Sequence, residues 1–284
     1  MQPFEAAVQA VIGGDLAKLE SLLKGDAELV RARSSSKHHA TLLHYIAANG
    51  VEGELQKSPK NAVDVAEMLL RAGAEVDALA DMYDGQYPAL SMLVSSTPPA
   101  EAGVQIPLAE TLLNHGADLE GAGAGKWRSP LMTALAFGFS ATAEMLARRG
   151  APVDNVAAAA GLGQREKVEN LLPASDALSR HRAMALAAQH GRKEIVALLL
   201  DAGEDPNRYN PDGNHSHSTP LHQAALAGHL DVVRLLVESG ARLDIRDTGY
   251  ESTPLGWAEH VGQTEIADYL RARGTNPEPL VPNP

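Results

Sequence analysis

The stretch from Ser218 to Asp247, STPLHQAALAGHLDVVRLLVESGARLDIRD, decides the fold of this chain. The Thr219 hydroxyl can cap a helix, and Pro220 in the first helical position loses no hydrogen bond that was available there. Gly228 and Gly240 suit the ends of two successive helices, where a Cβ would clash. The stretch therefore predicts a helix pair, followed by a short hairpin that leads into the next unit.

The same register recurs along the chain. It returns at once from Ser252 as STPLGWAEHVGQTEIADYLRARG, and glycines end second helices elsewhere. Paired apolar residues recur in the second helix of each unit. They indicate about eight units, most of them with a period of ~33 residues. These pairs are Leu22–Leu23, Leu69–Leu70, Leu112–Leu113, Met145–Leu146, Leu171–Leu172, Leu199–Leu200, Leu235–Leu236 and Tyr269–Leu270.

The segment T-P-L-H-x-A stands at Thr219 to Ala224, and this register resembles the ankyrin repeat. The resemblance implies an α-solenoid of stacked antiparallel helix pairs, joined by short β-hairpin or finger loops, with a concave inner face. It covers residues 1–275 as one repeat domain and leaves a Pro-rich tail at 276–284. Ankyrin arrays bind many unrelated targets, so the resemblance implies a binding function without naming a partner.

Composition narrows the classes of partner. Apolar residues make up 44% of the 284 residues but aromatic residues only 4%, which favours helices packed through small side chains. The formal net charge of −12 opposes binding to nucleic acid or to an anionic membrane. The chain has no cysteine, which excludes disulfides and thiolate metal sites.

The N-terminal sequence has no pattern typical of a signal peptide, and no apolar stretch approaches the ~18 residues of a membrane span. We therefore expect a soluble, cytoplasmic protein. No phosphate loop, dinucleotide fingerprint, H-E-x-x-H or G-x-S-x-G segment is present, and we expect no cofactor. The glycines of 121–125 (GAGAG) lie in a predicted finger and indicate no site.

Two insertions interrupt the repeat, at 51–61 in the second unit and at 97–103 in the third. Both are predicted at the turn between the two helices of their unit. They are interpreted either as tolerated surface loops or as a rim that partly closes one end of the concave groove.

The fifth and sixth units are shortened, which leaves little chain for a finger. The longest finger, Asn207 to Ser218, follows this gap, and the two together predict a notch suited to a ligand. The polar and aromatic residues predicted around the notch are Tyr209, His215, His217, His181, Arg182, Gln189, His190, Gln223, Trp257, Glu259 and His260.

Within this group, Glu259 stands where a small apolar residue is expected. A buried carboxylate needs a partner, and we expect His260, Gln223 or a finger histidine to be that partner. His181 and Arg182 are predicted to begin the inner helix of the sixth unit. His215 and His217, two apart in an extended segment, would share a face. They could be exposed loop residues, binding or catalytic groups, or metal ligands; a metal would need a third ligand, such as Glu259, His181 or Asp212, and we expect none.

A second cluster lies at the predicted fingertips of the earlier units. Exposed tyrosine, tryptophan and arginine are typical of binding hot spots, so this row favours recognition. Its members are Lys37, His38, His39, Asp81, Met82, Tyr83, Tyr87, Trp127 and Arg128. Four other histidines have structural explanations: His44 and His222 are expected to tie one repeat to the next, and His115 and His229 to lie at helix ends or turns.

The leading hypothesis is a non-catalytic protein that binds a protein partner through its concave face and fingers. The alternative is an enzyme or a binder of a small polar ligand that uses the notch. Its acid–base groups would be His215, His217, His181 and Glu259, with Arg182 and Tyr209 orienting the substrate. A buried Glu259 hydrogen-bonded to a histidine is the condition for this alternative.

Overall fold

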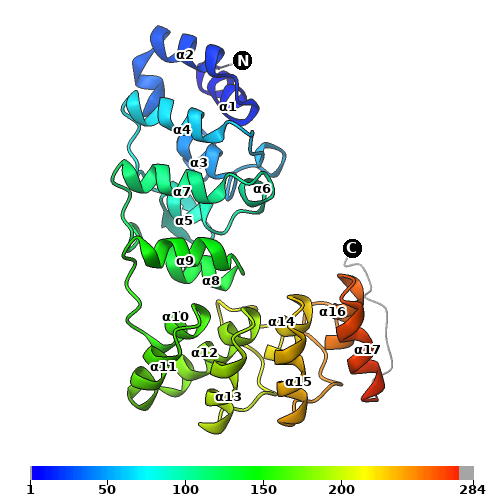
Figure 1. Ribbon diagram of the computed structural model, residues 1–284. Coiled ribbons are helices and arrows are strands. Elements are labelled where there is room, and N and C mark those ends of the chain that lie inside the picture. Colours follow the sequence, from blue (N-terminus) through cyan, green and yellow to red (C-terminus); the bar gives the residue numbers. More distant parts are fainter. Residues whose placement is uncertain (1, 275–284) are drawn as a thin grey trace. The chain divides into compact units, whose positions relative to one another are not determined.

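The computed structural model of the protein describes residues 2–274 (Figure 1). Thr275 and the predicted tail at 276–284 lie outside the described residues. The chain divides into two compact units, one formed by residues up to 134 together with 141–152, the other by 135–140 together with the residues from 153 onward.

The first unit contains three helix pairs, α1 with α2, α3 with α4 and α5 with α7, and the residues of a fourth pair, α8 with α9, are divided between the units. Its elements in chain order are α1 (Pro3–Gly13), α2 (Leu16–Gly25), η1 (Ala27–Val30), α3 (Leu42–Ala47), η2 (Gly53–Leu55), α4 (Ala62–Arg71), β1 (Ala80–Met82), β2 (Gly85–Tyr87), α5 (Ala89–Leu93), α6 (Thr97–Glu101), α7 (Gln105–Asn114), α8 (Pro130–Ala136) and α9 (Ser140–Arg148).

The second unit continues the same alternation of inner and outer helices. Its elements are α10 (Val156–Gly161), α11 (Arg165–Leu171), η3 (Leu172–Ala174), α12 (Ala177–Gln189), α13 (Lys193–Asp201), α14 (Pro220–Leu226), α15 (Leu230–Glu238), α16 (Pro254–His260) and α17 (Thr264–Ala272).

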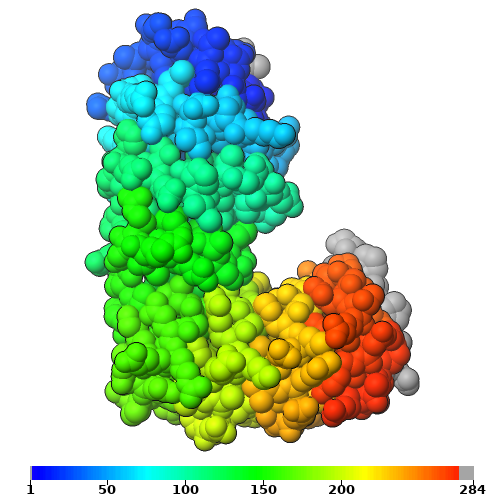
Figure 2. Space-filling model, viewed as in Figure 1, coloured from blue at the N-terminus to red at the C-terminus, as the bar shows by residue number. Residues whose placement is uncertain are grey.

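Within each unit, the inner helices stack on one another, and so do the outer helices. In the first unit α1 contacts α3 and α3 contacts α5, while α2 contacts α4 and α4 contacts α7. In the second unit α10, α12, α14 and α16 form the inner row, and α11, α13, α15 and α17 the outer row. Figure 2 shows the same order as successive bands of colour within each unit. The predicted solenoid of stacked helix pairs is confirmed.

The packing explains the composition. The outer helix α15 buries Val232, Val233 and Leu236, at positions i, i+1 and i+4, and so presents one apolar stripe. The inner helices α10 and α12 are buried on all sides over long alanine-rich runs, which let neighbouring helices approach closely. Few aromatic side chains fit between helices this close. Within the described part of the chain, no helix is both long and apolar enough to cross a membrane.

Histidines tie neighbouring repeats together as expected. His222 Nδ1 accepts hydrogen bonds from the backbone nitrogen and the hydroxyl of Thr219, at 3.3 and 2.8 Å, and its Nε2 donates to Ser252 O at 3.1 Å. His44 repeats the arrangement, with Thr41 at one ring nitrogen and Tyr87 O at the other. Burial lowers the pKa of both imidazoles to about 4, so the rings are neutral at pH 7.

Both insertions lie between the two helices of their unit. The first folds around η2, and Asn61 at its end donates from Nδ2 to Gly14 O at 2.9 Å. The second is not a loop but the short helix α6, whose Pro99 is buried. Pro98 and Pro99 lie in the first turn of α6, where proline is accepted.

The sixth unit begins differently from its prediction. Only Ser175 and Asp176 separate η3 from α12, so no finger projects there. The Asp176 side chain caps α12 by accepting from Ser179 N at 2.7 Å. The helix therefore starts at Ala177, and His181 and Arg182 lie in its second turn instead of at its start. A helix extension has replaced the missing finger.

Candidate partner-binding surface

Three fingers of the first unit are joined edge to edge. We call them the finger row, made of residues 34–40, 79–87 and 121–128. Asp81 N donates to His38 O at 2.8 Å, which links the first finger to the second. Gln86 and Ala124 exchange two backbone hydrogen bonds, at 2.8 and 3.0 Å, which link the second to the third. Backbone pairing of this kind holds the fingers as one continuous surface.

The second finger is the only hairpin of regular strands among residues 2–274. β1 and β2 pair in antiparallel register and turn through Tyr83 and Asp84, whose φ angles are +49° and +59°. Both turn residues are thus left-handed, a conformation that glycine and asparagine prefer. Tyr83 is 56% exposed, and its hydroxyl donates to Asn49 Oδ1 at 2.6 Å.

Strand alternation divides the predicted fingertip residues. Met82 and Tyr87 were placed in the exposed row, but both side chains are buried. Successive strand residues point to opposite faces, so Asp81 faces outward while Met82 faces the core. The prediction was therefore wrong for Met82 and Tyr87.

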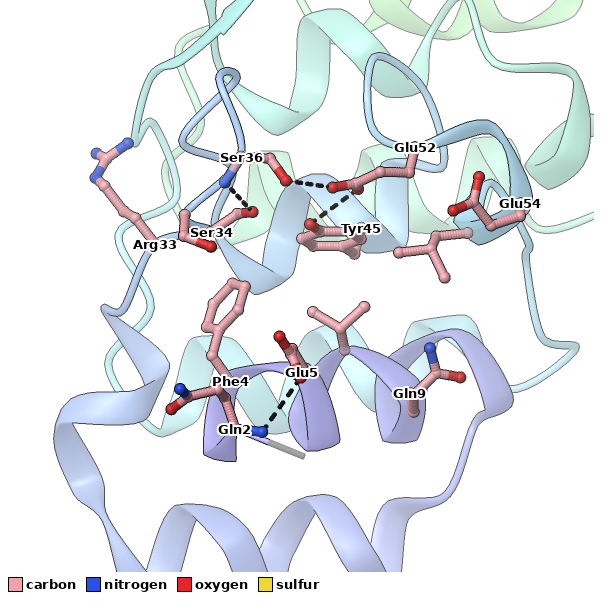
Figure 3. Close-up of a pocket in the computed structure, with 13 residues that line it drawn as sticks. Gln2, Phe4, Glu5, Gln9, Arg33, Ser34, Ser36, Tyr45, Glu52 and Glu54 are labelled. Atoms are coloured by element: carbon pink, nitrogen blue, oxygen red, sulfur yellow. Dashed lines mark hydrogen bonds between the residues drawn. The ribbon is translucent and has the colours of Figure 1, made fainter.

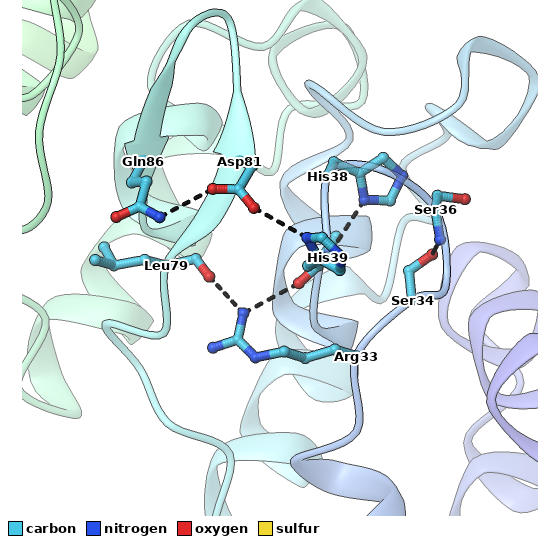
Figure 4. A network of polar contacts seen from close by, with 9 residues as sticks. Arg33, Ser34, Ser36, His38, His39, Leu79, Asp81 and Gln86 are labelled. Atoms are coloured by element: carbon cyan, nitrogen blue, oxygen red, sulfur yellow. Dashed lines mark hydrogen bonds and ion pairs between the residues drawn. The ribbon is translucent and has the colours of Figure 1, made fainter.

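A polar network organises the outward face of the first two fingers (Figure 4). Asp81 accepts from Gln86 Nε2 at 2.9 Å and lies 2.9 Å from His39 Nδ1. The hydrogen bonds from Gln86 and His39 lower the pKa of Asp81. Arg33 Nη1 donates to the carbonyl oxygens of His39 and Leu79, and so joins the two fingers from beneath.

Adjacent histidines of the first finger face in opposite directions. The His39 side chain is 57% exposed, whereas that of His38 is only 12% exposed. His38 Nδ1 accepts from Ala40 N at 3.1 Å, and its Nε2 lies 3.2 Å from Glu52 Oε1. His38 therefore braces the finger against the first insertion and does not contribute to the outer surface.

The third finger presents a cationic and aromatic tip. The Lys126 ammonium lies 5.6 Å from the centre of the half-buried Trp127 ring. Arg128 is exposed, and its Nε donates to Gly121 O at 2.8 Å, which fixes the guanidinium at the rim of the finger. Of the predicted fingertip residues, the finger row exposes Lys37, His39, Asp81, Tyr83 and Arg128.

The long finger of the second unit lies against α12 and does not stand clear of it. Arg182 Nη2 donates to Asp212 O at 2.9 Å, and His215 Nε2 to Ala136 O at 2.9 Å. His181 Nε2 donates to Tyr209 O at 2.7 Å and fixes the base of the finger. Asn210 and Asn214 are buried in the same packing. The expectation of a finger that stands clear was wrong, because these contacts hold it against α12 and against Ala136 at the end of α8.

The two finger histidines do not share an extended strand. His215 has a φ of +56°, in a turn, and its ring centre lies 6.0 Å from that of His217. Burial lowers the pKa of His215, which its hydrogen bond to Ala136 O only partly offsets. Among residues 2–274, no three histidine, aspartate or glutamate side chains are grouped so that they could hold a metal ion.

Trp257 and Gln223 have structural partners in the described chain. Trp257 is buried, its Nε1 donates to Asp247 Oδ2 at 2.9 Å, and its ring lies 5.7 Å from that of His217. Gln223 Nε2 donates to Ser218 Oγ at 2.9 Å. Tyr209 is 42% exposed, and its hydroxyl donates to Arg246 O at 2.6 Å. Of these side chains, only Tyr209 is accessible to a partner.

Glu259 departs from its prediction. It was expected to be buried with a histidine partner, but it is exposed and pairs with Arg271 Nη2 at 2.6 Å. His260, beside it, is also exposed. α16 ends at His260, so both side chains lie at the solvent end of the helix. The condition set for the catalytic alternative is not met, and His181 and His215 each use a ring nitrogen to hold a backbone carbonyl.

Two organising acids were missed in the sequence. Asp247 accepts from three backbone nitrogens and from Trp257, and the segment Asp-Thr-Gly that begins with it is typical of a turn in which aspartate caps the following amides. Glu52 accepts from Ser36 Oγ and Tyr45 OH, at 2.6 and 3.1 Å. No local pattern identifies Glu52, because its partners come from other segments.

Comparison with known proteins places the chain in a family. A family model of ankyrin repeats in three copies matches residues 155–247 and 186–279. The ankyrin repeat and KH domain-containing protein mask-1 of Caenorhabditis elegans is 31% identical over 229 residues, which are 75% of this chain but 8% of that protein.

Two shorter relatives are covered almost completely. Human cyclin-dependent kinase 4 inhibitor B is 35% identical over 126 residues, or 43% of this chain and 88% of the inhibitor. The inhibitor of the same name from Bos taurus is 37% identical over 132 residues, or 45% of this chain and 97% of the inhibitor. On these matches and on its stacked helix pairs, the chain belongs to the ankyrin-repeat family.

Proposed function

We propose that this chain binds a protein partner through its inner helices and fingers, and that the finger row of the first unit is the main contact surface. The observation that carries the proposal is the backbone pairing of the three fingers, which fixes the segments that carry the exposed residues His39, Tyr83 and Arg128. A fixed surface loses little conformational entropy on binding.

The residue types support recognition. Tyrosine, tryptophan and arginine are enriched among the residues that dominate binding energy, and here they occupy successive fingertips. Tyr83 also holds a left-handed backbone that a glycine would adopt at lower cost, and its ring is exposed at the turn of the second finger.

The family supports the general role. Ankyrin repeats serve in protein–protein interaction, and two relatives are named as inhibitors of cyclin-dependent kinase 4, so the names describe action on another protein. The identity of the partner of this chain does not follow from theirs. A cytoplasmic location forms part of the proposal and is supported by the absence of cysteine.

Site-specific photo-crosslinking tests this proposal. A photoreactive phenylalanine analogue at position 83 is compared with the same residue at Glu110, which is exposed on the outer helix α7 of the same unit. We expect position 83 to crosslink one discrete protein in the cell of origin and position 110 not to. Equal crosslinking from both positions would contradict a role for the finger row.

A further inference from the structure

Two histidines of the second unit hold the long finger in place. His181 Nε2, on α12, donates to Tyr209 O at 2.7 Å, at the base of the finger. His215 Nε2, further along the finger, donates to Ala136 O at 2.9 Å, and residues 135–140 belong to the same unit. An imidazole changes its charge close to neutral pH, so both attachments depend on groups that can take up a proton.

The His181 ring has no favourable place for a second proton. Its side chain is only 2% exposed, and its Nδ1 is buried without a hydrogen-bond partner among residues 2–274. Because Nε2 already carries the proton that it donates to Tyr209 O, a further proton would go to Nδ1. It would create a donor without an acceptor and a positive charge in a buried position, which are both unfavourable. The attached position of the long finger therefore requires a neutral His181.

Both imidazoles resist protonation while the finger is attached. Burial lowers the pKa of His181 and of His215 below the ordinary value of 6.5, and the hydrogen bonds to the carbonyl oxygens offset burial only in part. A lowered pKa stabilises a state fully above the ordinary pKa and progressively less as the pH falls below it. The attached position is therefore favoured in full above pH 6.5 and is weakened in acid.

The charged groups around the two rings leave this direction unchanged. Arg208 opposes protonation of His181, whereas Glu204 and Asp205 favour it, and His217 opposes protonation of His215. Glu204 is itself paired with the Arg180 guanidinium at 3.1 Å. The other charged or titratable side chains of the adjoining segments are Arg182, His190, Arg192, Asp212, His229 and Arg246. Burial thus decides the direction of the pKa shift for both rings.

The attached finger also buries polar atoms. Asn210 and Asn214 are 3% and 2% exposed. Within the described chain, Oδ1 of Asn210 and Nδ2 of Asn214 have no hydrogen-bond partner, which is unfavourable in a buried position. His215 has a left-handed backbone, with a φ of +56°, which is uncommon for residues other than glycine. These features narrow the margin by which the attached position is favoured, so the loss of two attachments is enough to shift the balance.

We propose that the long finger is released by acid, because protonation of His181 and His215 frees it from α12 and from Ala136. The release itself does not depend on the proposed function. Its consequence does, since the fingers and inner helices form the proposed contact surface. A freed finger would change the surface that the second unit presents to a partner, including the position of Tyr209.

Hydrogen exchange at pH 7 and pH 5 tests the release. The reporters are the backbone amides of Asn210 and Asn214, which donate to Ser218 O and Pro211 O, and each rate is divided by its intrinsic rate at that pH. The amide of Val233, buried in α15, reports on unfolding of the whole unit. We expect the protection of the two finger amides to fall about fivefold or more, since the preference for a neutral imidazole falls up to tenfold with each pH unit. Protection of Val233 should stay unchanged.

Glutamine variants assign the effect to the two rings. A glutamine amide can donate to the same carbonyl oxygen but takes up no proton, so His181→Gln/His215→Gln should show a fall of less than about twofold. His260→Gln removes an exposed histidine of the same unit and should behave as the wild type. An equal fall in the double variant and the wild type would overturn the inference. Unchanged protection of the wild-type finger amides at pH 5 would also overturn it.

NMR titration of the wild-type imidazoles decides the question if the double variant does not fold. The Cε1 resonances of His181 and His215 should titrate over the same pH range in which the finger amides lose protection. Titration of both rings without loss of protection would contradict the release. Because these measurements use no partner, the release can fail while recognition through Tyr83 stands, and the reverse.

Discussion

The indole Nε1 of Trp257 donates to the carboxylate of Asp247 at 2.9 Å, and both side chains are buried. The same carboxylate accepts from the backbone nitrogens of Gly249, Tyr250 and Ser252, at 2.9, 2.6 and 3.0 Å. One acid thus fixes both the last finger of the second unit and the aromatic residue of α16. Buried hydrogen-bond networks of this kind are costly to break, since each lost acceptor leaves a donor unsatisfied.

Replacing Asp247 by alanine should therefore destabilise the second unit by about 3–5 kcal/mol, because four donors lose their acceptor. Asp244→Ala is the control, since that exposed acid pairs with Arg242 and its loss should leave the stability nearly unchanged. Urea unfolding in a Trp127→Phe background measures the effect, because Trp257 is then the only tryptophan. An Asp247→Ala protein as stable as Asp244→Ala would refute this role.

Acid should destabilise the first unit through His44. Burial holds the folded pKa at about 4, below the ordinary value of 6.5, so stability is full above pH 6.5 and is lost as the pH falls toward 4. Between pH 7 and pH 5 the loss from this one group is about 2 kcal/mol. Unfolding is followed by Trp127 in a Trp257→Phe background, and His44→Gln should flatten the pH dependence. An unchanged slope in His44→Gln would show that other groups cause it.

Replacing Tyr83–Asp84 by Asn–Gly should stabilise the first unit by about 0.5–1 kcal/mol, since these residues suit the left-handed turn. The same change should weaken partner binding, because it removes the exposed ring. Tyr83→Ala is the control: it removes the ring but gains no such stability. Unchanged partner binding in both variants would show that the Tyr83 side chain does not contribute to partner binding.

Gly123 allows the third finger to approach the second. Its φ is +83°, and an added Cβ would clash with Gln86 O, at the backbone pair that joins the fingers. Gly123→Ala should cost about 3 kcal/mol or more, through strain and the lost pairing. Gly116 has a φ of +90°, but a Cβ added there would meet open space. Gly116→Ala should therefore lower the free energy of unfolding by only about 1–2 kcal/mol. Urea unfolding followed by Trp127 compares the two, and equal losses would argue against the close approach.

The repeat and its helix ends were predictable because they depend on local chemistry. Thr219, Pro220, Gly228 and His222 each act within their own repeat or on the next one, so their spacing carries the information. The start of α12 could also have been predicted from the sequence, because Asp176 is a typical helix-capping residue and caps this helix.

The candidate site was predictable only in part. Side chains such as His215 and Glu259 find partners in distant segments, at Ala136 and Arg271, which no spacing reveals. Met82 and Tyr87 were misplaced because the alternation of a three-residue strand depends on its register. A pocket lined by Phe4, Ser36, Tyr45 and Glu52 (Figure 3) was missed because its walls come from four separate segments.

The affinity of the protein crosslinked at position 83 tests the central claim most directly. Calorimetric titration compares the wild type, Tyr83→Ala and Glu110→Ala against that purified protein. We predict that Tyr83→Ala weakens the affinity at least about tenfold, as expected for a hot-spot aromatic residue, and that Glu110→Ala leaves it unchanged. Equal affinity of Tyr83→Ala and the wild type would contradict recognition through the finger row.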